Sequence, residues 1–166
     1  MFLPADPRRG EILKLAGHAT QGGLLDNQRT RWRELVTQLL GAIKDESGGQ
    51  IPERRQHLRA DAELPVDILA PDQIARLVTS SIGSGGLALR VEEVIPALTL
   101  LDFSIKVEQR RIPLLVRAQV VYSHPGELGA CFIDIYQHDR ELLEGVAVRA
   151  LLGADETARK GSTQEK

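Results

Sequence analysis

The chain has 166 residues and a formal net charge of −2, with 42% hydrophobic, 27% charged and only 4% aromatic residues. These proportions are typical of a packed globular protein and exclude a fibrous or wholly disordered chain. The length fits one domain of ordinary size with an additional segment. Few aromatic side chains and a slightly acidic balance exclude a general DNA-binding protein, which needs a broad basic face.

The charges are distributed unevenly, because residues 1–59 carry 10 basic and 7 acidic side chains whereas residues 60–166 carry 11 and 16. A locally basic region in an acidic chain suits a compact anionic ligand. Cys131 is the single cysteine and stands in the apolar run "GACFIDI", so we expect a small core residue and a reducing cytoplasmic location. The start "MFLPADPRRGE" does not resemble a signal peptide, and no apolar run approaches the ~20 residues of a membrane span. We therefore expect no membrane insertion.

Residues 1–50 are predicted as an arm followed by an amphipathic helix. Residues 1–23 mix proline, glycine and charges, and we expect a poorly defined arm. The helix is expected over residues 26–44, with Asp26 as its N-cap. Its apolar residues recur at steps of three and four: Trp32, Leu35, Val36, Leu39, Leu40 and Ile43. This stripe could cover the following domain, form a homodimer contact or dock on a protein partner.

Residues 51–153 are predicted as a mainly β domain. After the linker "ESGGQIP" the apolar period becomes two, which is typical of an all-β barrel or sandwich. Six strands are expected: "AELPVDIL", "ARLVTS", "GLALRV", "FSIKVE", "PLLVRAQVVYS" and "LGACFIDI". A helix is expected over residues 137–153 with Gly153 as its stop, followed by a polar tail at residues 154–166.

Two short motifs are candidates for a ligand site. The first, "IPERRQHLRA", clusters Arg54, Arg55 and Arg59, and the planar guanidinium suits phosphate and the edge of guanine. By its spacing alone this cluster is also compatible with a charged linker. The second, "SSIGSGGLAL", is a Ser/Gly turn that feeds an alternating strand, where glycine lets a ligand approach the main chain. By itself it is also compatible with an ordinary β-turn.

Taken together, these motifs and the strand pattern resemble the PilZ domain, the bacterial receptor module for cyclic di-GMP, over residues 53–152. "ERRQHLRADAELPVDI" has the form of the family's R-x-x-x-R motif before the first strand. "SIGSGGL" stands where the family has D/N-x-S-x-x-G. The resemblance implies a six-stranded antiparallel β-barrel with a C-terminal helix and an N-terminal amphipathic helix.

The resemblance also implies the binding residues, which are Arg54, Arg55, Arg59, Ser81, Gly83 and Gly86. The chain departs from the family pattern at two of them: Ser81 replaces a carboxylate or amide, and Gly83 replaces a serine. A hydroxyl cannot accept from guanine as a carboxylate does. We therefore expect weakened binding, and we expect Ser81→Asp with Gly83→Ser to tighten it.

The function expected from the resemblance is that of a cytoplasmic receptor which binds cyclic di-GMP and relays it to an unidentified protein partner in motility, biofilm or exopolysaccharide control. The alternative is an interaction module that has lost nucleotide binding. Catalysis is not expected, and neither is a cofactor beyond the ligand itself. The four histidines are scattered without metal-ligand spacing, so no metal site is expected.

Overall fold

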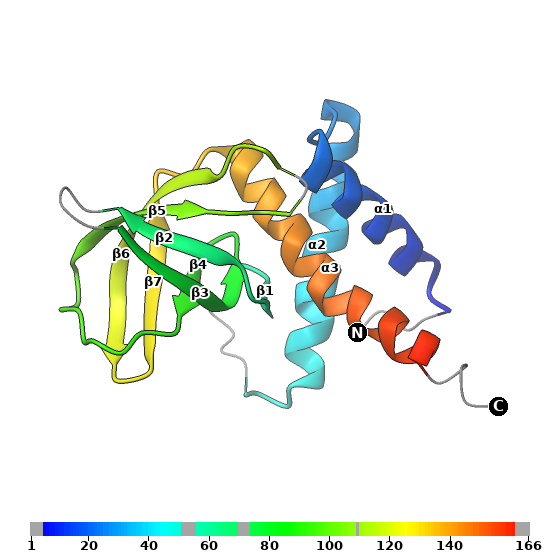
Figure 1. The fold of residues 1–166 in the computed structure, drawn as a ribbon. Coiled ribbons are helices and arrows are strands. Elements are labelled where there is room, and N and C mark those ends of the chain that lie inside the picture. The colour runs from blue at the N-terminus through cyan, green and yellow to red at the C-terminus, as the bar shows by residue number, and fades with distance from the viewer. Residues whose placement is uncertain (1–4, 51–55, 70–73, 109, 162–166) are drawn as a thin grey trace.

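The computed structural model describes residues 5–50, 56–69, 74–108 and 110–161, and Figure 1 shows a β-barrel beside a layer of helices. In chain order the elements are α1 (Pro7–Gln21), α2 (Asp26–Glu46), β1 (Arg59–Asp61), β2 (Pro65–Leu69), β3 (Ile74–Gly83), β4 (Gly86–Leu89), β5 (Leu100–Ile105), β6 (Leu114–His124), β7 (Glu127–Ile133) and α3 (Gln137–Gly161). No helix among these is long and apolar enough to cross a membrane.

The barrel is closed and antiparallel, as the family resemblance implies. Its strands follow the order β3-β2-β5-β6-β7-β4, and β4 pairs back with β3. These six strands correspond to the six predicted ones. The short strand β1 was not predicted, and it pairs with the end of β3 outside the closed ring. Only three residues form it, too few for an alternating pattern to be recognised.

The prediction of a poorly defined arm at residues 1–23 was wrong, because residues 7–21 form helix α1. The carboxylate of Asp6 accepts a hydrogen bond from the backbone N–H of Arg8 at 2.9 Å, and Pro7 occupies the first turn. The two glycines within α1 weaken its intrinsic propensity. Packing on α3 stabilises it instead, since Ala16 and Ala19 face Gly145 so closely that a Cβ there would lie 3.1 Å from the Ala16 carbonyl oxygen.

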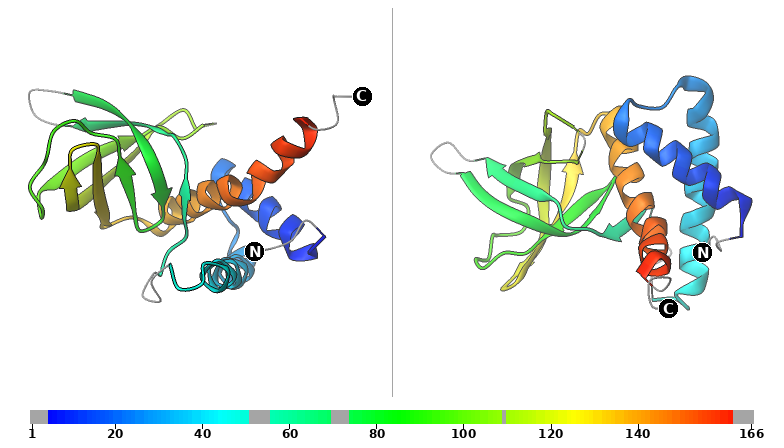
Figure 2. Two further views of the ribbon diagram at one scale, coloured as in Figure 1. Left: turned by 90° about the horizontal axis from the view of Figure 1, so that it is seen from below. Right: turned by 45° about the vertical axis from the view of Figure 1, so that its right-hand side comes forward.

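Helix α3 lies between the barrel and the other two helices (Figure 2). Near its start, Leu142 and Leu143 pack into the barrel core. One to two turns later, Ala147, Val148 and Leu152 belong to a second core that α1 and α2 complete. The prediction that Gly153 ends this helix was wrong, because α3 continues to Gly161. Contacts on α1, including a hydrogen bond from Arg9 to the Leu152 carbonyl, stabilise its later turns.

The apolar stripe of α2 is buried within the chain's own helical core. Trp32, Leu35 and Leu39 are fully buried there, together with Leu58 and Ala60 from the segment of β1, so these three side chains of the stripe are not free for a dimer contact. Two polar contacts connect the same helix to α3: Trp32 Nε1 donates to Glu144 at 3.3 Å, and Arg29 Nε donates to Glu141 at 3.0 Å. The helix begins at Asp26 as predicted, but the N-cap is Leu25, whose N–H donates to the Gln28 side chain at 3.0 Å.

Replacement of Trp32 tests this packing. Trp32→Ala should lower the free energy of unfolding by about 3–5 kcal/mol, because it removes a fully buried indole and leaves a cavity between the helices. Urea denaturation followed by circular dichroism measures the change. The control is Arg33→Ala on the exposed face of the same helix, which should stay within about 0.5 kcal/mol of the wild type. Equal effects of the two substitutions would contradict the buried role of Trp32.

Candidate functional site

The pairing of β1 with β3 brings the arginine motif and the Ser/Gly motif together. Arg59 lies opposite Gly83, and Asp61 lies opposite Ser81. Directly opposite residues on antiparallel strands have Cβ atoms about 4.5–5.5 Å apart. The two segments, separated by about 20 residues in the chain, therefore form one continuous surface at this end of β3.

Two β-bulges place the side chains of this surface on the outside of the barrel. In β3 the register shifts between Thr79 and Ser81, and in β6 it shifts between Val120 and Tyr122. Val120 remains in the barrel core, and Tyr122 pairs with Gly129 on the outer face. Bulges commonly redirect a side chain beside a functional site. Here they direct Ser81 and Tyr122 to the same face.

On this part of the barrel's outer face, one row of small residues has a larger residue at each end. Successive cross-strand pairs run from Tyr122 through Gly129, Ala88 and Ser81 to Asp61, on five neighbouring strands. With strand spacings of about 4.8 Å, the row is roughly 19 Å wide. We name it the small-residue row. Ala88 is only 2% exposed and the Tyr122 ring covers Gly129, so the small residues form the floor of this face. Its accessible groups are the Tyr122 ring at one end and Arg59 and Asp61 at the other.

The glycines of this face are required by close contacts. A Cβ on Gly83 would overlap the carbonyl oxygen of Leu58, and one on Gly86 would overlap that of Ala130. The Tyr122 ring lies directly over Gly129, which has no room for a side chain. Gly83 and Gly86 are thus explained by packing of neighbouring backbone. The glycine at position 83 accommodates the arginine-bearing segment.

His57 holds the segment before β1 against the turn between β3 and β4. Its Nδ1 lies 3.2 Å from the hydroxyl of Ser84, which is fully buried. Its ring also packs on Gly85, where a Cβ would lie 2.6 Å from the imidazole. Burial lowers the pKa of His57, and the positive charge of Arg140 lowers it further. A neutral imidazole is therefore part of the folded arrangement.

An acidic group lies beside the aromatic end of the row. Ser80 donates a hydrogen bond to Glu127 at 3.3 Å, and Tyr122 stacks on His124 with ring centroids 5.9 Å apart. Burial raises the pKa of Tyr122, and the nearby Glu127 carboxylate raises it further. The phenol therefore keeps its proton and can donate a hydrogen bond as well as stack. Arg59 is close enough to act electrostatically on the same phenol.

The structure brings together four of the six residues predicted for the site: Arg59, Ser81, Gly83 and Gly86. Arg54 and Arg55 lie outside the described residues. Three contributors were not predicted as binding groups, namely His57, Asp61 and Tyr122. The alternating run that contains Tyr122 could not identify it, because the bulge that turns its ring outward is not visible in the sequence.

Cys131 was expected in the core and is exposed instead. It pairs with Gly86 and Gln119 on the outer face, while its neighbour Ala130 faces the barrel core. The expectation failed because an apolar run does not reveal which of its residues face inward. Within the described residues, no three His, Cys, Asp or Glu side chains form a group that could hold a metal ion.

The PilZ domain family model matches residues 53–148, more than half of the chain, and the chain belongs to this family. No curated protein matches the chain significantly in sequence. Among solved structures, the PilZ domain of YcgR from Escherichia coli, determined with c-di-GMP, is 16% identical with a TM-score of 0.53, over 65% of this chain and 99% of that one. The Bacillus subtilis inhibitor of motility MotI/DgrA is 21% identical with a TM-score of 0.52, over 61% of this chain. The match spans only 53% of that protein's length. These likenesses establish the barrel fold.

The close approach at Gly83 reverses one expectation from the sequence. Ser81→Asp together with Gly83→Ser was expected to tighten ligand binding, but the Cβ of a serine at position 83 would collide with the Leu58 carbonyl and displace β1. We expect Gly83→Ser alone to destabilise the protein by about 1–3 kcal/mol in urea denaturation. Gly17→Ser in α1, where nothing lies within 4 Å of an added Cβ, is the control and should change stability little. If Gly83→Ser were as stable as the control, the Leu58 carbonyl could not lie as close to position 83 as the structure places it.

The lowered pKa of His57 predicts a pH dependence of stability. The unfolded chain titrates near the ordinary value of 6.5, so below that pH it binds protons more readily than the folded chain does. Stability is therefore full above pH 6.5 and falls as the pH drops from there toward the lower folded pKa. His57→Gln should reduce this acid loss between pH 7.5 and pH 5.5, measured by urea denaturation. An unchanged slope in the variant would show that His57 does not hold the segment in its neutral form.

Proposed function

We propose that this chain is a receptor for cyclic di-GMP and that the small-residue row with Arg59 is its binding face. The carrying observation is the pairing of β1 with β3, which places Arg59 and Asp61 opposite Gly83 and Ser81. Membership of the PilZ family and the solved structure of the YcgR PilZ domain with c-di-GMP support the same ligand. In this proposal Arg59 contacts a phosphate or the O6 and N7 edge of guanine.

Tyr122 and Asp61 complete the chemistry of the proposed face. Tyr122 is 39% exposed and presents an aromatic ring at the end of the row, where a base can stack. Asp61 is exposed, and the described part of the chain offers it no ion-pair partner. Its position opposite Ser81 lets its carboxylate accept from guanine N1–H and N2–H. Asp61 on β1 thereby replaces the carboxylate or amide that the family carries on the neighbouring strand, at the position of Ser81.

A route from the ligand to a protein partner follows from the residues that flank Arg59. Leu58 and Ala60 are buried in the helical core, although Arg59 between them faces the proposed ligand. A ligand that binds one position of β1 better than another therefore favours one arrangement of the helices. We propose that the helical layer relays binding to a partner in motility or biofilm control, consistent with the motility role in the name of the Bacillus relative.

Isothermal titration calorimetry with cyclic di-GMP tests the binding face. Arg59→Ala should weaken binding by about 1.5–3 kcal/mol, or roughly 10- to 150-fold, because it removes charge-assisted hydrogen bonds. Arg76→Ala is the matched control, since Arg76 lies on the other half of β3 and is mostly exposed. Flat heats from the wild-type chain at high ligand concentration would support the alternative of an interaction module without nucleotide binding.

The role of Asp61 has its own test. Asp61→Asn should weaken cyclic di-GMP binding about tenfold, because the amide loses the charge-assisted acceptor while keeping the shape of the side chain. Asp67→Asn on β2 changes the chain's charge equally and should leave affinity unchanged. If Asp61→Asn binds as tightly as the control while Arg59→Ala does not, the ligand uses another acceptor, and the rest of the binding face stands.

A further inference from the structure

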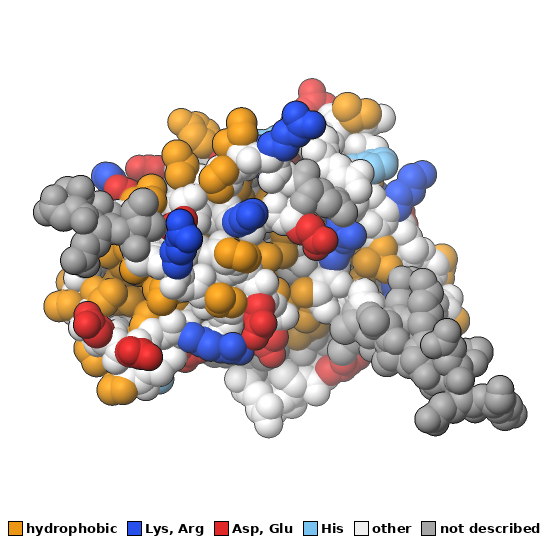
Figure 3. Space-filling view, in the orientation of Figure 1, with side chains coloured by type: hydrophobic (Ala, Val, Ile, Leu, Met, Phe, Trp, Pro, Cys, Tyr) orange, Lys and Arg blue, Asp and Glu red, His pale blue; other side chains and the backbone are white. Residues whose placement is uncertain are grey.

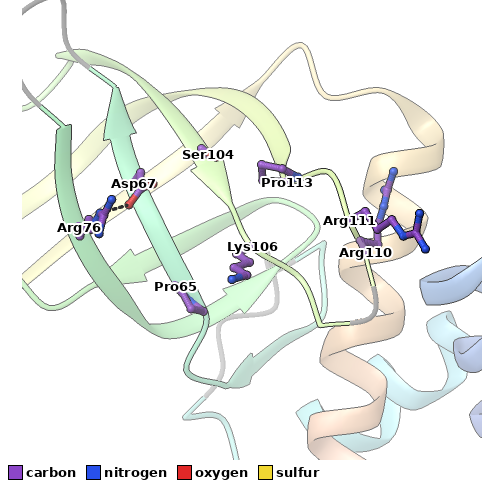
Figure 4. A pocket seen from close by; sticks show the side chains of 8 residues that line it. All are labelled: Pro65, Asp67, Arg76, Ser104, Lys106, Arg110, Arg111 and Pro113. Carbon is purple, nitrogen blue, oxygen red and sulfur yellow. Dashed lines mark ion pairs between the residues drawn. The ribbon is translucent and has the colours of Figure 1, made fainter.

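A basic groove of about 500 Å³ lies on the outer face of the barrel (Figure 4). It runs over the outer face of β2 and β5, whereas the small-residue row is centred on β7 and β4 across the closed ring. Strand β3 contributes Arg76 to the groove and, beyond its bulge, Ser81 to the row. We name it the β2–β5 groove. Its lining residues are Pro65, Asp67, Arg76, Ser104, Lys106, Arg110, Arg111 and Pro113.

The charges of this groove are poorly compensated within the protein. Asp67 is the only acidic residue among the described residues that line it, and its carboxylate lies 4.0 Å from Arg76 Nε, too far for a hydrogen bond. In the described part of the chain, neither Lys106 nor Arg111 has an ion-pair partner. Arg110 Nη1 is buried without a hydrogen-bond acceptor among the described residues, 3.9 Å from Asp139.

Several arginines elsewhere in the chain have closer acidic partners. Arg31 makes two short contacts with Glu11, at 2.7 and 2.8 Å, and Arg117 contacts Asp102 at 2.8 Å. Like charges gathered without partners repel one another, which is a cost to the folded state. An external anion would offset this cost in the groove. The net acidity of the chain makes such a concentrated basic surface more distinctive.

The spacing of the cations favours an extended anionic chain over a single phosphate. Arg76 on β3 is in register with Ser104 across β2, and Lys106 follows two residues later, so about 12 Å separates the backbone positions of the two cations. Carboxylates distributed along a peptide can contact cations spread over such a distance. Electrostatic complementarity of this kind also speeds encounter with an acidic partner.

Apolar side chains beside the cations indicate a peptide that also carries hydrophobic residues. Leu115 lies opposite Ser104 on the same outer face and is 69% exposed, and Ile112 between Arg111 and Pro113 is 73% exposed. Figure 3 shows basic and hydrophobic side chains interspersed over this face of the barrel. Single exposed apolar side chains are common, but these two adjoin a poorly compensated basic groove.

We infer that the β2–β5 groove binds an acidic, partly apolar peptide segment of a protein partner. Carboxylates of the peptide contact Arg76, Lys106 and Arg111, and its apolar residues contact Leu115 and Ile112. The inference does not depend on cyclic di-GMP binding, because none of these residues belongs to the small-residue row.

Fluorescence anisotropy with a labelled peptide of alternating Glu and Leu tests this inference at low and at physiological ionic strength. The wild-type chain should bind it, and Lys106→Glu with Arg111→Glu should weaken binding at least about tenfold. The control, Lys14→Glu with Arg33→Glu, makes an equal charge change on the exposed faces of α1 and α2 and should bind the peptide with wild-type affinity. The same peptide with Gln in place of Glu should not bind. Added salt should weaken the binding of the acidic peptide.

Several outcomes would overturn the inference. An equal loss of peptide affinity in the two double variants would show a nonspecific effect of net charge. If the wild-type chain did not bind the acidic peptide even at low salt, the groove would not be a peptide site. Pyrophosphate that binds the groove while the acidic peptide does not would make it a phosphate site. Circular dichroism must show that both double variants are folded, and a calorimetric titration with cyclic di-GMP should be unaffected by Lys106→Glu with Arg111→Glu. A parallel loss of cyclic di-GMP binding would show that the groove and the row are one site.

Discussion

The packing of α3 into two hydrophobic cores is the constraint on which the rest of this structure depends. Leu142 and Leu143 complete the barrel core, and Val148 and Leu152 complete the core shared with α1 and α2. One rigid helix therefore fixes the helical layer relative to the barrel. Apolar burial supplies most of the stabilisation. Polar contacts such as Arg29 with Glu141 add directional specificity.

Strand β1 depends on this arrangement because it contacts both parts. Its backbone pairs with β3 of the barrel, while Leu58 and Ala60 are buried among the helices. Arg59 faces outward between them. A short strand with few hydrogen bonds of its own is held by its neighbours, and it is the element whose position a ligand on the outer face can most easily change. The proposed receptor function and its relay to the helices thus share one segment.

Much of the fold could be predicted from the sequence, and less of the site. Alternation with period two located all six barrel strands, and the apolar stripe located α2, because both patterns record which residues are buried. Helix α1 was not predicted, since its glycines weaken the local signal and contacts with α3 stabilise it. Of the candidate site, the sequence motifs predicted Arg59, Ser81, Gly83 and Gly86. Tyr122 and Asp61 became neighbours of the motif only through strand pairing.

The sequence by itself determined the six strands of the barrel, the amphipathic helix α2, the family and the two motifs, because these depend on local patterns of burial and backbone freedom. Only the tertiary structure decided which side chains from other segments lie beside the motifs. The bulges in β3 and β6 turn Ser81 and Tyr122 to the same side, and the carbonyl of Leu58 explains why position 83 is a glycine. Strand register and backbone contact between distant segments produce these features, and neither can be predicted from the residues of one segment alone.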